Sequence, residues 1–302
     1  MMRLIGLYRE AECSPGEHRS NDAHLLELVG QALELRGLRV DLMTLSEAAR
    51  SRQSATMVFS MCQGRAALDL LMRWELEGTR LINSPRGALN TYRDRLPVIL
   101  QAAAIRFPPT TIVPTARGDD PAIEVNGGLW LKRGDVHASV TADVQWADTA
   151  NAVRDGLREF ASRGITHAAL QAHRSGEEIK FYGIAAGAFF HWFYPEGRSA
   201  ASQRRGDHAG DAPSNGNGRL PIDVGALRQL GEDAAAAAGL DVFGGDVIVG
   251  PSGELTLIDL NDWPSFAPCR DRAADAIADY LMRRVDAAWN PGVVSSANES
   301  AV

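Results

Sequence analysis

Short hydrophobic runs alternate with longer amphipathic stretches over the first 92 residues of the chain. The runs predict β-strands at Arg3–Tyr8, Val40–Leu45, Met57–Met61 and Arg80–Ile82. Apolar residues recur at helical spacing from a capping residue, Asn21 or Asp22, to Arg36, and again over Ala66–Glu77, and a glycine follows each of these stretches. Strands that alternate with helices in this way predict an α/β domain with a parallel sheet covered on both faces.

The loops after the first and third predicted strands are rich in polar side chains. In open α/β sheets such loops gather at the carboxyl ends of the strands, where ligands bind. The substrate-side candidates are Arg9, Glu10, Glu12, Glu17, His18, Arg19, Cys62, Gln63, Gly64 and Arg65. Ordinary solvated loops are the alternative for each of them. No G-x-G-x-x-G follows the first strand, so dinucleotide binding is not supported.

Shorter strands and three more long helices are predicted in the rest of the chain. The strands are Leu129–Lys132, Ala168–His173, Ile179–Ile184 and Phe189–Tyr194, and the helices are Thr149–Arg163, Val224–Ala238 and Ala273–Val285. Glu196–Arg219 has no Val, Ile, Leu, Met or Phe and is predicted to be a flexible loop, either a disordered insertion or a lid. Residues 287–302 are expected to form a disordered tail.

Two β-rich runs near the C-terminus, Asp246–Val249 and Leu255–Asn261, flank the turn signal Pro251-Ser252-Gly253-Glu254. A hairpin with Ser252 and Gly253 paired at its tip places Asp246 opposite Asp259, with Asn261 on the same face. Opposed like charges destabilise a sheet, so this arrangement favours a bound cation, and oxygen ligands suit Mg²⁺. The alternative is that these residues only cap turns, and a register slip of one residue would separate them.

Composition narrows the class of protein. The chain has 302 residues and a net charge of −7, which argues against nucleic acid as the main partner and against a polybasic membrane contact. Cys13, Cys62 and Cys269 are far apart in the sequence, so a disulfide framework or a zinc site is not expected. No apolar run approaches the roughly 20 residues of a membrane span. We expect a cytoplasmic protein, and a homodimer is compatible with the sequence.

The segments GGDVIV and LIDLNDWP, on either side of the turn, resemble the C-terminal signature of the ATP-grasp superfamily. In that family an acidic residue on one strand and an acidic-x-Asn on the next hold the Mg²⁺ of MgATP. The resemblance implies this role for Asp246, Asp259 and Asn261. It implies a Rossmann-like domain over residues 1–92, followed by two α+β subdomains, 93–172 and 173–286, that clasp ATP.

Further residues resemble the nucleotide-binding positions of the same family. Asn83-Ser84-Pro85 followed by Asp94-Arg95 resembles a family segment in which Asn-x-Pro precedes Asp-Lys, and Arg95 replaces the lysine that contacts phosphate. The resemblance implies that Lys132 holds the α- and β-phosphates. Gln171 and His173 would contact adenine, and Lys180 would reach the substrate or the γ-phosphate. His137 matches a histidine of the inositol-phosphate-kinase branch, and Arg270 and Arg272 are placed for an anionic substrate group.

Three functions are compatible with this resemblance. The first, which we favour, is a ligase of the RimK-like kind, in which ATP activates a substrate carboxylate as an acyl phosphate and an amine attacks it. The second is a kinase that phosphorylates a small hydroxylated, inositol-phosphate-like substrate, which Asp259-x-Asn261 and His137 favour. The third is a nucleotide-binding module without turnover, which the replacement at Arg95 suggests. The partners expected in each case are small molecules.

Overall fold

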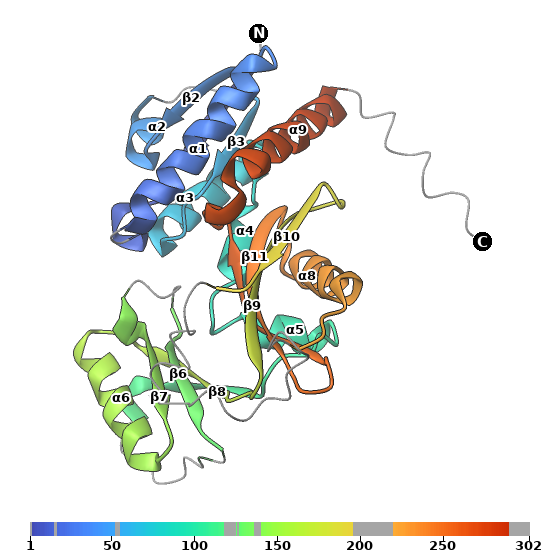
Figure 1. Ribbon diagram of the computed structural model, residues 1–302. Helices are drawn as coiled ribbons and strands as arrows, with labels where there is room; N and C mark the ends of the chain where they lie inside the picture. Colours follow the sequence, from blue (N-terminus) through green and yellow to red (C-terminus); the bar gives the residue numbers. More distant parts are fainter. Residues whose placement is uncertain are drawn as a thin grey trace.

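Three sheets, each flanked by helices, follow one another along the chain in this computed structural model (Figure 1). The structure describes residues 2–14, 17–51, 55–117, 125, 127–135, 140–195 and 220–289. The predicted flexible loop at 196–219 and the tail from residue 290 lie outside the described residues. Short 3-10 helices are found at Ala11–Cys13, Thr115–Arg117, Thr141–Asp143 and Ala267–Cys269.

The first sheet is parallel, as the alternating pattern predicts. Its strands are β1 (Arg3–Leu7), β2 (Arg39–Met43), β3 (Met57–Ser60) and β4 (Leu81–Ile82), in the order β2-β1-β3-β4. Its helices are α1 (Glu17–Leu35), α2 (Leu45–Ser51) and α3 (Arg65–Leu76). The predicted start of α1 is wrong, because Asn21 and Asp22 lie inside the helix. Asp22 instead accepts a hydrogen bond from Ser14 Oγ at 2.6 Å.

The second sheet is antiparallel and presents two different faces. Its strands are β5 (Thr110–Pro114), β6 (Leu129–Arg133), β7 (Val144–Ala147) and β8 (His167–Ala172), in the order β5-β8-β6-β7. Leu131 and Leu170 pack in one core cluster with Leu157 and Phe160 of α6 (Ala150–Ser162). Because side chains alternate along a strand, Lys132 points to the face away from α6.

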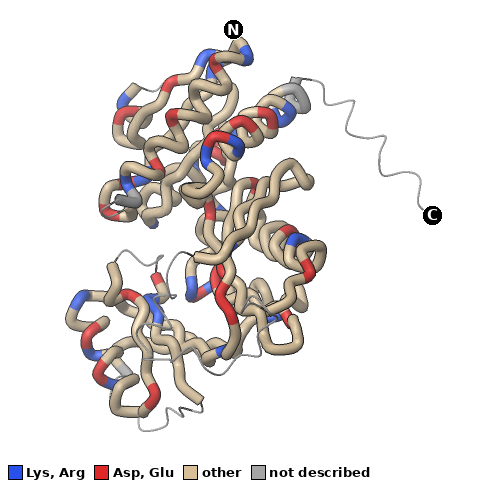
Figure 2. The backbone as a smooth tube through the Cα atoms, viewed as in Figure 1, with Lys and Arg blue, Asp and Glu red and all other residues tan. Residues whose placement is uncertain are grey.

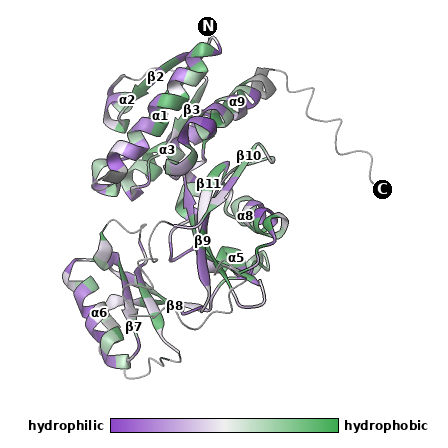
Figure 3. Cartoon of the chain, in the orientation of Figure 1, coloured by the Kyte–Doolittle hydropathy of each residue, from purple (hydrophilic) through white to green (hydrophobic). Residues whose placement is uncertain are grey.

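The third sheet is also antiparallel and carries the predicted hairpin. Its strands are β9 (Glu177–Ile184), β10 (Phe189–Phe193), β11 (Val242–Val249) and β12 (Leu255–Asp262), in the order β10-β9-β11-β12. The helices α4 (Pro85–Asn90), α5 (Leu96–Ala102) and α8 (Val224–Ala238) precede or cover it (Figure 1). Hydrophobic and hydrophilic residues lie on different sides of such helices, so one side faces the core (Figure 3).

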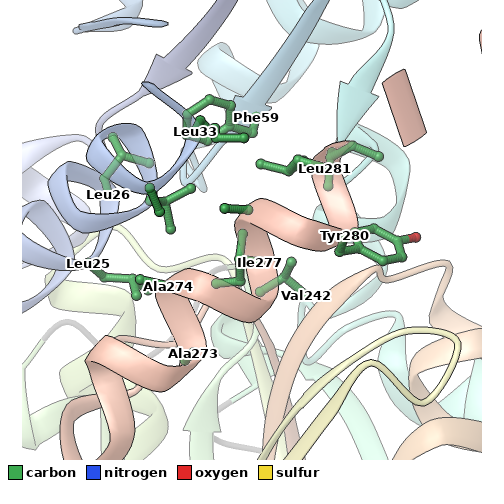
Figure 4. Packing of buried hydrophobic residues seen from close by; sticks show 14 of the residues in the cluster. Leu25, Leu26, Leu33, Phe59, Val242, Ala273, Ala274, Ile277, Tyr280 and Leu281 are labelled. Atoms are coloured by element: carbon green, nitrogen blue, oxygen red, sulfur yellow. The ribbon is translucent and has the colours of Figure 1, made fainter. Parts of the chain in front are cut away.

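The last helix, α9 (Arg270–Trp289), returns to the first domain. Ala274, Ile277 and Leu281 of α9 are buried in one cluster with Leu25 and Leu33 of α1 (Figure 4). The backbone of α9 is helical to Trp289, so the predicted tail does not begin at residue 287. A buried side chain also links the first domain to the hairpin, because Asn83 donates to the Val242 carbonyl at 2.7 Å and accepts from its N–H at 2.8 Å.

Core packing crosses two of the domain boundaries expected from the sequence. Leu96 and Leu100 of α5 lie in the core of the third sheet with Phe181 and Leu227, although the expected boundaries place α5 with the second. Likewise α9 packs on α1 although the boundaries place it with the third. The three sheets follow the expected order along the chain, and the exact boundaries stay a prediction.

Candidate nucleotide and metal site

Two carboxylates face each other across the hairpin of the third sheet. Asp246 of β11 pairs with Asp259 of β12, as predicted. Nearer the turn Val249 pairs with Leu255, so the predicted register there is wrong by one residue. A β-bulge at Ile258 takes up the difference and restores the expected pairing at the carboxylates.

The bulge also connects the third sheet to the second. An extra residue in a strand has no partner in the ladder, so its carbonyl is free to accept other donors. The Ile258 carbonyl accepts hydrogen bonds from Lys132 Nζ of β6 at 3.1 Å and from Gln171 Nε2 of β8 at 3.2 Å. The structure therefore brings two of the predicted nucleotide residues next to the predicted metal ligand Asp259. Figure 2 shows acidic and basic segments near one another where these sheets meet.

Arg93 is a member of this site that the sequence analysis missed. Its Nη2 donates to Asp259 Oδ2 at 2.8 Å, and the residue is only 7% exposed. It lies two positions before Arg95 in the sequence YRDR, and only the fold distinguishes the two arginines. Arg95 is exposed at the start of α5, and it does not line the cavity that Arg93, Lys132, Gln171 and Asp259 share.

That shared cavity is small, at about 10 Å³, which is room for a single water molecule. Besides the polar residues above, it is lined by the apolar residues Leu96, Pro97, Phe107, Ala169 and Ile258, together with Thr110. A phosphate or a nucleobase is much larger than a water molecule. Binding of either at this position therefore requires the second and third sheets, or the side chains between them, to move apart.

Burial changes the acidity of Lys132. Removal from water disfavours the charged ammonium and lowers the pKa of Lys132 to about 8, and nearby Arg93 adds to the effect. The negative charge of Asp259 opposes it. Lys132 therefore lies where an added anion would stabilise its charged form.

A larger cavity of about 220 Å³ lies on the other side of Asp246. Lys180 of β9 lines it, and its Nζ donates to Asp246 Oδ1 at 2.7 Å. Burial opposes the charge on Lys180, but Asp246 and Glu178 outweigh burial and raise the pKa of Lys180. Asn261 also lines this cavity, so the carboxylate and amide predicted to hold the metal both face it.

Residues of the first domain close the same cavity. Of the predicted substrate-side residues, Arg9 and Gln63 line it. Gln63 Nε2 donates to Asp262 Oδ1 at 2.6 Å, and burial raises the pKa of Asp262 to about 6 although Arg9 and Gln63 oppose the shift. Other lining residues were not predicted as site residues, because only the fold brings them here: Cys13, Ser14, Asp22, Tyr182, Gly244, Gly245, Asp262, Pro264 and Ser265.

The remaining substrate-side candidates whose side chains the structure describes do not line this cavity. Glu10 accepts hydrogen bonds from the backbone N–H groups of Gln63 and Gly64 and so shapes the loop before α3. Cys62 is buried, Glu12 and Arg19 are exposed, and Arg65 is ion-paired with Asp69 on the surface. The side chains of Glu17 and His18 lie outside the described residues.

His173, predicted for the adenine hinge, lies in an aromatic cluster at one end of the second sheet. Trp130 Nε1 donates to His173 Nδ1 at 3.2 Å, and the ring of Trp146 packs edge-on against His173 at 5.3 Å. His173 does not line the small cavity, whereas Gln171 does. Trp130 and Lys132 are two residues apart on β6, so the cluster and the cation share one face of the sheet.

The two predicted substrate arginines of α9 point in different directions. Arg270 Nη2 donates to Asn21 Oδ1 of α1 at 2.8 Å, and its Nε donates to the carbonyl of Ser265, which lines the larger cavity. Arg272 lies over the ring of Phe189, with the guanidinium carbon 5.8 Å from the ring centroid. Neither arginine lines the larger cavity. His137 lies outside the described residues.

The donor set fits a hard divalent cation that shares its ligands with phosphate. Asp246, Asp259 and Asn261 offer carboxylate and amide oxygens, and two of the cations around them, Lys132 and Arg93, are buried. Within the described ranges no group of three or more His, Cys, Asp or Glu side chains is arranged to hold a metal. The site therefore suits Mg²⁺ brought with an anionic ligand better than a metal bound by protein ligands alone.

The fold defined by these three sheets is the ATP-grasp fold, and comparison with solved structures shows it directly. A RimK domain ATP-grasp protein from Sphaerobacter thermophilus superposes with a TM-score of 0.66 at 16% identity, over 92% of this chain and 98% of that chain. D-alanine–D-alanine ligase from Bacillus anthracis, complexed with ATP, gives 0.64 at 11% identity, over 96% and 99%. VanG D-Ala:D-Ser ligase from Enterococcus faecalis gives 0.66 at 13% identity, over 94% and 99%.

The sequence comparisons add nothing to this fold assignment. No protein-family model matches the chain, and no curated protein matches its sequence. Among the helices that the structure describes, none is long and apolar enough to cross a membrane.

Proposed function

We propose that this protein is an ATP- and Mg²⁺-dependent ligase that joins a substrate carboxylate to an amine. The observation that carries the proposal is the opposed pair Asp246–Asp259, set between Lys132 on one side and a polar cavity of about 220 Å³ on the other. Phosphoryl transfer depends chiefly on positioning and charge neutralisation, and this arrangement can supply both. The ligases among the structures of similar fold support the same class of reaction.

The roles of the chain's own residues follow from their positions. Asp246, Asp259 and Asn261 would hold Mg²⁺, which neutralises phosphate oxygens when it is bound. Lys132 offers a buried positive charge to the phosphates, and Gln171 lies beside it. Lys180 lies between Asp246 and the larger cavity, so its ammonium is placed to orient a substrate anion close to the metal.

The larger cavity supports the ligase over a kinase that acts on a polyphosphate. Among the described residues, its lining includes the carboxylates of Asp22, Asp246 and Asp262 but only two cations, Arg9 and Lys180. Both cations already contact carboxylates, at 3.4 Å for Arg9 and Asp22 and at 2.7 Å for Lys180 and Asp246. A substrate with several phosphates would meet few available positive charges here, whereas a substrate amine would be attracted.

The products of the reaction test this proposal. The ligase predicts release of inorganic phosphate and ADP that requires both a carboxylate and an amine, and that increases when the two are screened together. Formation of ADP with transfer of the phosphoryl group to a hydroxyl, and no free phosphate, would support the kinase instead. ATP binding without any ADP formation across such a screen would support a binding module. The substrates, the cytoplasmic location and a homodimer remain predictions.

A further inference from the structure

Arg93 is a buried guanidinium whose donors are only partly used. The residue is 7% exposed, and Nη2 donates to Asp259 Oδ2 at 2.8 Å. Its Nε and Nη1 are also buried, and within the described part of the chain they have no hydrogen-bond partner. Buried charged donors are costly unless they are hydrogen-bonded, so a native structure that keeps two of them points to a ligand that they bind.

The surroundings of Arg93 indicate what that ligand is. Of the residues that the structure describes, two cations, Arg93 and Lys132, and one carboxylate, Asp259, line the small cavity. The two cations repel each other, because both line one small cavity. A second anion at this position would relieve that repulsion. The Nε–H and Nη1–H groups of Arg93 point from different edges of the guanidinium, so each can donate to a separate phosphoryl oxygen, and the permanent positive charge attracts phosphate.

We propose that Arg93 binds phosphoryl oxygens of the nucleotide through Nε and Nη1, in the place that the family resemblance implies for Arg95. This inference rests on the proposed function, because it takes the ligand to be a nucleoside triphosphate. Arg95 is exposed and lies outside the lining of the cavity. Arg93 reaches the cavity from the segment between α4 and α5. Its contact with Asp259 would place the bound phosphate next to that metal ligand.

A purely structural role for Arg93 is the competing explanation. In that case Arg93 only holds Asp259 in position. Substitution of Arg93 would then weaken metal-dependent binding, because Asp259 would be misplaced. The two roles differ in their dependence on the metal. Direct contact with phosphate operates with or without Mg²⁺, whereas an effect through Asp259 requires Mg²⁺.

Calorimetric titration of the full-length protein separates these roles. The variants are Arg93→Lys and Arg93→Gln, with Arg95→Gln as the matched control, and the ligands are MgATP, ATP in EDTA, and adenosine. We expect Arg93→Gln to weaken ATP binding at least about tenfold both with Mg²⁺ and in EDTA, because charged hydrogen bonds to phosphate are lost. Arg93→Lys should weaken it less. Adenosine affinity should be unchanged, and Arg95→Gln should alter ATP affinity less than about threefold.

Three results would overturn the assignment. A loss confined to MgATP would make Arg93 a positioning residue for Asp259, and an equal or larger loss in Arg95→Gln would return the phosphate contact to Arg95. If Arg93→Gln does not fold, Arg93→Lys carries the test. Unchanged ATP affinity in folded Arg93→Lys, with Mg²⁺ and in EDTA, would contradict the contact through Nε and Nη1. Absence of ATP binding by the wild type would instead refute the proposed function itself.

Discussion

At the scale of single residues, the two predicted metal carboxylates have different neighbours and therefore different structural costs. Asp259 is buried and paired with buried Arg93, so loss of the Asp259 carboxylate leaves the charge of Arg93 without its ion-pair partner in the interior. Asp246 pairs with Lys180, which is 31% exposed and also lies 3.6 Å from Glu178. We therefore expect the same loss of metal-dependent binding from both sites but unequal losses of stability.

The matched variants are Asp246→Asn and Asp259→Asn. Both should abolish the part of ATP affinity that depends on Mg²⁺, measured by calorimetry. Asp259→Asn should lower the free energy of unfolding by about 3–5 kcal/mol, because one partner of a buried pair is removed. Asp246→Asn should lower it by about 1 kcal/mol or less, because its ion pair is partly solvated. Mg²⁺-dependent affinity that survives in both variants would contradict the metal site.

The two lysines of the site are expected to differ in their effect on nucleotide binding. Lys132 lines the small cavity beside Arg93, while Lys180 lines the larger one. Lys132→Ala should therefore weaken ATP binding much more than Lys180→Ala, and Lys180→Ala should chiefly reduce turnover with both substrates present. Equal losses of ATP affinity in calorimetry would show that the division between nucleotide and substrate lysines is wrong.

The acidity of Lys132 gives this site a pH signature. Its pKa of about 8 lies below the roughly 10.4 of an unfolded lysine, so between these values the unfolded chain binds more protons and stability rises with pH. A bound phosphate favours the protonated form. ATP binding near pH 9 should therefore take up a fraction of a proton, measured by calorimetry in buffers of different ionisation enthalpy. Lys132→Met should show no uptake, and an equal uptake in that variant would exclude Lys132 as its source.

At the scale of elements, the hairpin shows what the sequence could predict and where it failed. Alternation along β11 and β12 and the turn at Pro251–Gly253 predicted the hairpin, but the predicted register was wrong by one residue near the turn, and Asp246 lies opposite Asp259 only because a bulge offsets that error. The bulge at Ile258 was not predictable, because nothing in the local pattern marks an extra residue whose carbonyl accepts from β6 and β8. Arg93 was missed for a similar reason, since burial distinguishes it from Arg95 and burial depends on tertiary packing.

The C-terminal helix was predicted from the sequence, but its packing position in the fold was not. Its apolar face predicts a buried side, and only the fold shows that the side packs on α1 of the first domain. The helix begins shortly after Trp263, whose carbonyl accepts from Arg9 Nη2 at 2.6 Å. The hairpin is thus tied to the first domain both by α9 and by this hydrogen bond, and the larger cavity lies between them.

A substitution in this packing should affect stability without affecting the nucleotide site. Ile277→Ala removes a fully buried side chain between α9 and α1 and should cost about 2–5 kcal/mol of unfolding free energy. Leu35→Ala on α1 is the control, because Leu35 is 88% exposed and should change stability by about 0.5 kcal/mol or less. Both should keep wild-type MgATP affinity by calorimetry. Loss of that affinity in Ile277→Ala alone would show that this packing positions the nucleotide site.

At the scale of the whole molecule, the site lies where elements from all three sheets meet. The metal ligands come from the third sheet, the nucleotide cation Lys132 and Gln171 come from the second, and Arg9 and Gln63 of the first domain close the substrate side. The hydrogen bonds to Ile258 hold the second and third sheets together around a cavity that admits one water molecule. Nucleotide binding should therefore replace these contacts and open this junction.

The central claim is that Mg²⁺ and ATP together occupy this junction. The most direct measurement is thermal unfolding of the wild-type protein with Mg²⁺ alone, with ATP alone, and with both. A ligand that binds only the folded state adds about 2.7 kcal/mol at 100 times its dissociation constant, which raises the midpoint of unfolding. We predict that Mg²⁺ and ATP together raise the midpoint much more than either does alone, and that this excess is absent in Asp246→Asn. An unchanged midpoint at millimolar MgATP would contradict the account and leave only the shared fold.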